Sequence, residues 1–104
     1  MLRATLILVA ALLASGTAWA GETTVVVGHN RIEPAQIRIA VGDTVVFHNV
    51  DAMPGGHTVK ADDGSFESPP LEKDQKWSHT FGEAGSYPIG IAQHPEARAT
   101  VIVE

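Results

Sequence analysis

Short apolar and β-branched runs, separated at close intervals by Gly, Pro and Asp, constrain the fold of this chain more than any other feature. In residues 44–50, Val45 and Phe47 alternate with Val46 and His48, which is typical of a strand with one buried face. Helical periodicity is almost absent. We therefore predict an all-β protein, an antiparallel Greek-key sandwich of seven or eight strands. The strands are expected at residues 23–27, 37–39, 44–50, 57–61, 77–81, 87–91 and 99–103.

The N-terminal residues have the pattern of an export signal. An apolar run at residues 4–13 follows a single arginine and precedes Ala18-Trp19-Ala20, a small-x-small cleavage pattern. The apolar run is too short to anchor the chain stably across a bilayer, although a retained N-terminal anchor is the alternative. We predict that residues 1–20 are a cleaved signal peptide, that residues 21–104 are one domain, and that the protein is periplasmic.

Composition excludes several classes of function. The chain has twelve Asp and Glu against seven Lys and Arg, a net charge of −5, and no cysteine. An acidic surface argues against nucleic acid as a partner, and we expect no membrane association after cleavage. Neither a nucleophile with an adjacent base nor a phosphate-binding glycine loop is evident, so we expect no enzymatic activity.

Two of the histidines are the best candidates for chemistry. His57 and His94 each lie at a strand end or in a loop, where a sandwich brings its tips together, and imidazole is a good copper ligand. The other three histidines have ordinary explanations. His29 is expected to be solvated, His48 to lie on the surface, and His79 to pack beside Trp77 and Phe81.

The surroundings of these two histidines resemble the cupredoxins, the small blue-copper proteins. Ala52-Met53-Pro54 followed by His57-Thr58-Val59 resembles the loop that holds the first copper histidine in the amicyanin branch. His94-Pro95 resembles the start of the C-terminal copper loop. The N-terminal half is similar to plastocyanin and amicyanin through Ile32-x-Pro34-x-x-Ile37-x-Ile39-x-x-Gly42-Asp43-x-Val45-x-Phe47-x-Asn49-x-Asp51.

The resemblance implies one copper ion held by His57 and His94, but it breaks at the sulfur ligands. The family's cysteine position is Ile91 here and its methionine position is Ala97, so neither residue inherits a copper role. Met53 and the backbone carbonyl of Gly56, in an apparent two-glycine insertion, are further candidate ligands. Without the thiolate, strong charge-transfer absorption and efficient electron transfer are not expected.

Three functions remain open. The first is a small periplasmic copper-binding protein with a reduced two-histidine site, which holds or delivers copper. The second is an electron carrier, as the plastocyanin and amicyanin resemblance implies. The third is a metal-free interaction module, in which the metal site has lapsed. The expected partner is a periplasmic redox or copper-handling protein, and the chain is expected to be a monomer.

Overall fold

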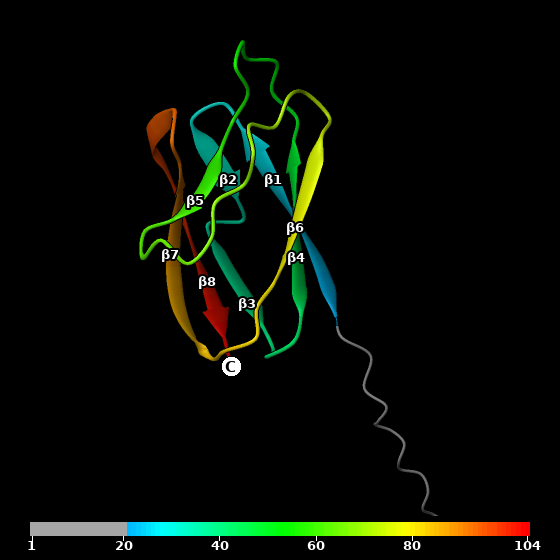
Figure 1. Ribbon diagram of the computed structural model, residues 1–104, viewed down its shortest axis with the longest axis vertical. Coiled ribbons are helices and arrows are strands. Elements are labelled where there is room, and N and C mark those ends of the chain that lie inside the picture. Colours follow the sequence, from blue (N-terminus) through cyan, green and yellow to red (C-terminus); the bar gives the residue numbers. More distant parts are fainter. Residues whose placement is uncertain (1–20) are drawn as a thin grey trace, which may run out of the picture.

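The computed structural model describes residues 21–104, so the predicted signal peptide lies outside the described residues. Two four-stranded sheets pack face to face, which confirms the all-β sandwich (Figure 1). One sheet has the order β2 (Arg31–Glu33), β1 (Glu22–Gly28), β4 (Thr44–Asn49), β6 (Lys76–Thr80), and the other the order β3 (Gln36–Ile39), β8 (His94–Val103), β7 (Gly85–Ile91), β5 (Val59–Ala61). No helix able to span a bilayer is found among residues 21–104.

The sheets are mixed rather than wholly antiparallel, which corrects one part of the prediction. β1 pairs with β4, and β3 with β8, in parallel register. The chain crosses from one sheet to the other between β2 and β3 and again at each step up to β7, so most neighbours within a sheet are not consecutive in sequence. β2 was not predicted, because three residues around a single buried Ile32 give almost no periodic signal.

The core lies between the sheets and follows the predicted alternation. Val45 and Phe47 of β4 are fully buried, whereas Val46 and His48 are partly exposed. An aromatic cluster fills the space beside β6. In it His79 stacks on Phe66, with ring centroids 4.3 Å apart, and meets Phe81 edge-on. His79 is therefore a packing residue, as expected.

Three connections meet at one end of the sandwich. They are the β1–β2 turn, the long β4–β5 loop and the β7–β8 turn, and all lie at the top in Figure 1, opposite the C-terminus. Residues far apart in sequence are thereby gathered at a single tip. His29, His57 and His94 belong to these connections or to the strand residues beside them.

Candidate metal centre

The backbone of the β4–β5 loop fixes His57 in the interior. The His57 N–H donates to the Leu71 carbonyl at 2.9 Å, and the Leu71 N–H donates to the His57 carbonyl at 2.8 Å. Just before it, the Gly56 N–H donates to the Met53 carbonyl at 2.9 Å and closes a turn over Pro54–Gly55. A side chain at Gly56 would lie 2.8 Å from the Leu71 carbonyl oxygen, and φ there is 76°. Glycine at this position lets the loop approach Leu71 closely and present His57 inward.

The β7–β8 turn brings His94 to the same place. It is a two-residue turn, Ala92–Gln93, between the paired residues Ile91 and His94. Gln93 ties this turn to the residue after His57, because its Oε1 accepts the Thr58 N–H at 2.8 Å and its Nε2 donates to Thr58 Oγ1 at 3.1 Å. As a result the His57 and His94 ring centroids lie 5.1 Å apart.

His57 presents one nitrogen that no protein group uses. Its Nε2 lies 3.0 Å from Asp51 Oδ2, and the hydrogen bond with His57, ahead of that with His29, holds the pKa of the Asp51 carboxyl below its ordinary value. An ionised carboxylate only accepts, so Nε2 carries a proton, and in the neutral imidazole Nδ1 therefore keeps its lone pair. The His57 side chain is 0% exposed, and its Nδ1 is buried with no hydrogen-bond partner. Such buried unpaired atoms are rare and call for an explanation.

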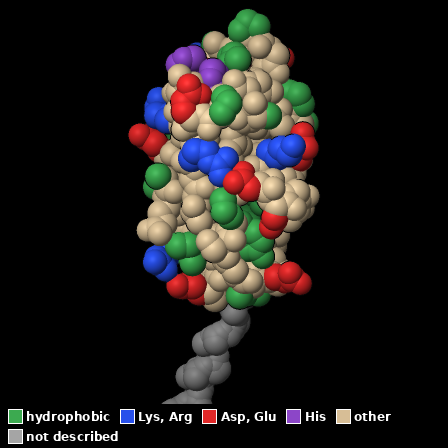
Figure 2. Space-filling model, turned by 90° about the vertical axis from the view of Figure 1, so that its left-hand side faces the viewer, with side chains coloured by type: hydrophobic (Ala, Val, Ile, Leu, Met, Phe, Trp, Pro, Cys, Tyr) green, Lys and Arg blue, Asp and Glu red, His purple; other side chains and the backbone are tan. Residues whose placement is uncertain are grey.

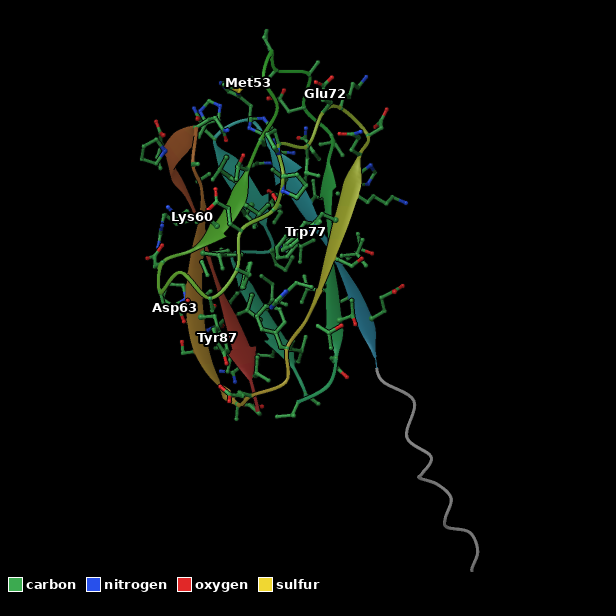
Figure 3. The ribbon with its side chains drawn as sticks, in the orientation of Figure 1. Met53, Lys60, Asp63, Glu72, Trp77 and Tyr87 are labelled. Carbon is green, nitrogen blue, oxygen red and sulfur yellow. The ribbon has the colours of Figure 1, made fainter. Side chains whose placement is uncertain are left out.

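His94 has the same arrangement of protons. Its Nε2 lies 3.0 Å from the Met53 Sδ atom, and a thioether can only accept a hydrogen bond. The proton therefore belongs on Nε2, which leaves the Nδ1 lone pair of His94 available. Figure 3 shows Met53 at this tip of the molecule. The role of the Gly56 carbonyl as a ligand stays a prediction.

The residues present are compatible with one ion between the two imidazoles. With a metal–nitrogen bond of about 2.0 Å an ion lies about 3.2 Å from each ring centroid, so rings up to about 6.4 Å apart can share it. The observed 5.1 Å is within that limit. Ile91 and Ala97 are buried in the core and offer no donor. Within residues 21–104, no group of three or more His, Cys, Asp or Glu side chains is placed so that it could hold a metal ion, so the two histidines are the whole of the protein's nitrogen and oxygen side-chain set for the ion.

Two residues at the tip have contacts that the sequence did not indicate. The His29 side chain is 65% exposed, as predicted, but it also contacts two other residues of the tip. Its Nδ1 lies 3.4 Å from Asp51 Oδ2, and its ring meets His94 edge-on at 4.9 Å. Asp51 had no assigned role, although a carboxylate six residues before a candidate ligand is the kind of partner that metal-bound histidines use. The His48 side chain is half-buried, and its Nε2 lies 3.8 Å from Asp74 Oδ1, away from this cluster.

Comparison with known proteins identifies the family. The chain is 34% identical over 87 residues to amicyanin of Paracoccus denitrificans, covering 81% of this chain and 66% of the relative, and 32% identical over 88 residues to amicyanin-alpha of Methylorubrum extorquens, covering 82% and 74%. The chain spans 66% of the length of the Paracoccus denitrificans amicyanin and 64% of the length of the Paracoccus versutus amicyanin, just under two thirds of each. No family model matches the chain.

Solved structures agree with the sequence relatives. An oxidized methionine-to-leucine mutant of amicyanin superposes with a TM-score of 0.72 at 33% identity, covering 79% of this chain and 81% of that one. A purple cupredoxin from Nitrosopumilus maritimus superposes with a TM-score of 0.71 at 25% identity, covering 79% and 99%. The chain therefore belongs to the cupredoxins, in their amicyanin-like branch, and it does so without a cysteine.

Proposed function

We propose that this protein is a small copper-binding cupredoxin that holds or delivers one copper ion. Its metal site has only the two histidine ligands, His57 and His94, and lacks the sulfur ligands of the family. The observation that carries the proposal is the fully buried, unpartnered Nδ1 of His57, with the His94 ring 5.1 Å away. Met53, in contact with His94, is the nearest soft donor and suits copper(I). When bound, copper supplies one-electron chemistry at the tip of the sandwich.

Without metal, the free Nδ1 of His57 destabilises the protein. A buried polar atom left without a partner costs about 1–3 kcal/mol. A metal ion removes that cost by taking the lone pair. Asp51 meanwhile fixes the tautomer and orientation of the ring from its other nitrogen, as carboxylate partners of metal-bound histidines do.

Electron transfer is the second candidate, because the relatives are amicyanins. The side chains at the sulfur positions argue against an efficient carrier. Ile91 and Ala97 supply no ligand, and a thiolate is the donor that couples a blue-copper centre to its partner. Holding or delivering copper demands less of the site than rapid cycling between two oxidation states does.

The proposal extends to location and partners. Residues 1–20 act as a cleaved signal peptide, and the remaining domain works in the periplasm as a monomer without enzymatic activity. Its partner is a periplasmic redox or copper-handling protein. N-terminal sequencing of protein from a periplasmic extract tests the first part, and a first residue other than Gly21 contradicts the predicted cleavage.

Copper(I) affinity tests the site directly. The purified protein competes with a chromogenic copper(I) chelator, alongside His57→Ala, His94→Ala and the control His48→Ala. Loss of either ligand should weaken binding at least about tenfold, whereas the control should match the wild type. If both ligand variants bind copper(I) as tightly as the wild type, the proposal is wrong. A pull-down that captures the same partner with and without copper would then favour the metal-free interaction module.

Cyclic voltammetry of the copper-loaded protein tests the electron-carrier function. If the protein shows no reversible wave, that function is excluded.

A further inference from the structure

β1 begins at the end of the sandwich opposite the metal centre (Figure 1). The residue before it, Gly21, accepts the Thr44 N–H on its carbonyl at 2.9 Å, and its own N–H donates to Asp43 Oδ1 at 2.8 Å. A Cβ at Gly21 would lie 3.1 Å from Asp43 Oδ2, so glycine lets the carboxylate approach the backbone closely. Figure 2 shows acidic and basic side chains at the surface of this end.

The turn between β3 and β4 holds the Asp43 carboxylate in place. The Asp43 N–H donates to the Ala40 carbonyl at 3.0 Å, and Asp43 Oδ2 accepts the Ala40 N–H at 3.0 Å. These two bonds leave Oδ1 directed at the Gly21 nitrogen. The hydrogen bonds from Ala40 and then from Gly21 hold the pKa of the Asp43 carboxyl below its ordinary value, so the group is ionised at neutral pH.

This carboxylate has no cationic side chain as a partner. Within residues 21–104, Asp43 forms no ion pair with Lys, Arg or His. The Arg38 guanidinium lines the same surface cavity, but it donates to Glu104 Oε2 at 2.8 Å. The negative charge of Asp43 is therefore met only by neutral backbone N–H groups.

We propose that Asp43 is the binding site for the N-terminal ammonium group that cleavage before Gly21 creates. The inference rests on the proposed cleavage and is independent of copper. Hydrolysis consumes one water: the Ala20 carbonyl carbon gains the oxygen and becomes a carboxylate, and the Gly21 nitrogen gains two protons. An α-amino group has a pKa of about 7.7–8.0, so the new terminus is charged at neutral pH. A nitrogen that donates as a neutral amide thus becomes a cation beside a carboxylate.

Processing therefore gives the protein an interaction that the uncleaved chain lacks. A charge-assisted hydrogen bond is stronger than a neutral one, and 2.8 Å is a normal length for it. Its position is where a strand would otherwise fray, because Gly21 precedes β1, which lies between β2 and β4. The ion pair holds this end of β1 against β4 only after the signal peptide has been removed. The uncleaved chain is the less stable form.

Urea unfolding of two forms tests the ion pair. One is the mature protein, residues 21–104, and the other carries Gly-Ser-Gly-Ser before Gly21, which moves the ammonium group away from Asp43. The unfolding constant of the mature protein should be about two- to fivefold lower, as for an exposed ion pair. Asp43→Asn should abolish that difference, because its amide is neutral. The variant weakens the contact with Ala40 in both forms, so a double-mutant cycle cancels that loss.

Glu104→Gln is the matched control. Its carboxylate lines the same cavity as Asp43 but pairs with Arg38, so the difference between the two forms should persist. If Asp43→Asn does not fold, added sodium chloride replaces it, because salt screens an exposed ion pair and should shrink the difference.

The outcomes separate this inference from the proposed function. Equal unfolding constants of the mature and extended forms, or a difference that persists in Asp43→Asn or in high salt, overturn the ion pair and leave the cleavage and the copper site untouched. A difference lost equally in Glu104→Gln shows a general charge effect and also overturns it. N-terminal sequencing of the periplasmic protein tests the cleavage separately, and a first residue other than Gly21 overturns the cleavage and the ion pair together.

Discussion

Replacement of His57 by leucine tests whether this histidine is kept for a ligand or for the core. When a buried polar residue with all its polar atoms hydrogen-bonded is replaced by an apolar residue, those hydrogen bonds are lost and the protein is destabilised. His57 is unusual because only one of its two nitrogens has a partner. We therefore expect His57→Leu to leave the stability of the metal-free protein almost unchanged.

The magnitude follows from two opposing terms. Removing the unpartnered Nδ1 relieves about 1–3 kcal/mol, and losing the charge-assisted hydrogen bond of Nε2 costs a similar amount, about 1.5–3 kcal/mol. The side chain of Asp51 is a quarter exposed, so its carboxylate regains water when the ring is removed. The net change in the free energy of unfolding should lie within about 1 kcal/mol of zero.

Asn49→Leu is the matched control, because Asn49 is also fully buried but fully satisfied. Its Nδ2 donates to the carbonyls of Asp51 and Leu71, and its Oδ1 accepts the Asp51 N–H. Loss of three hydrogen bonds should destabilise the protein by about 3 kcal/mol, at about 1 kcal/mol each. Urea unfolding of the chelator-treated proteins measures both changes. If His57→Leu is as destabilising as Asn49→Leu, His57 is a structural residue and our reasoning fails.

Three further predictions concern the metal, the carboxylate and the pH. Ile91→Cys restores a thiolate at the family position, so its Cu(II) form should show an intense visible charge-transfer band that the wild type lacks; an absorption spectrum without that band contradicts the assigned position. Asp51→Asn keeps a hydrogen-bond acceptor but removes the charge, and Cu(I) affinity should fall about 10–100-fold by chelator competition. Burial lowers the pKa of His79, so the unfolded state binds more protons and stability falls as the pH drops below about 6.5. Urea unfolding midpoints measured from pH 7 to pH 5 should therefore fall less in His79→Gln than in the wild type. An equal fall in both proteins refutes this role of His79.

The fold was predictable because its signals are local. Alternation, β-branched runs and the turn residues between them located seven of the eight strands, and alternation is clearest in β4, where Val45 and Phe47 face the core. The parallel pairing of β1 with β4 was not predictable from alternation, because a period of two says which face is buried but not which strand lies alongside. Which strands lie side by side depends on the order in which the chain crosses between the two sheets.

The candidate site was predictable only in part. His57 and His94 were found from the resemblance, whereas Asp51 and His29 had no pattern of their own. Their importance depends on the β4–β5 loop and the β1–β2 turn meeting at one tip, which is a tertiary contact. Gly55–Gly56 stood out in the sequence as an apparent insertion, and the close approach of Gly56 to Leu71 is a tertiary contact that explains why glycine is needed there.

The charge near the two histidines bears on which function the site can perform. In an intact blue-copper centre the thiolate supplies one negative charge to the ion, and here Ile91 removes it. Asp51 returns one negative charge, but across the His57 ring rather than through a bond to the ion. One carboxylate balances Cu(I) beside two neutral imidazoles and leaves Cu(II) with an uncompensated charge near a buried ring, which is costly. The site should therefore favour the reduced ion, and a centre that strongly favours one oxidation state is better suited to holding copper than to passing electrons.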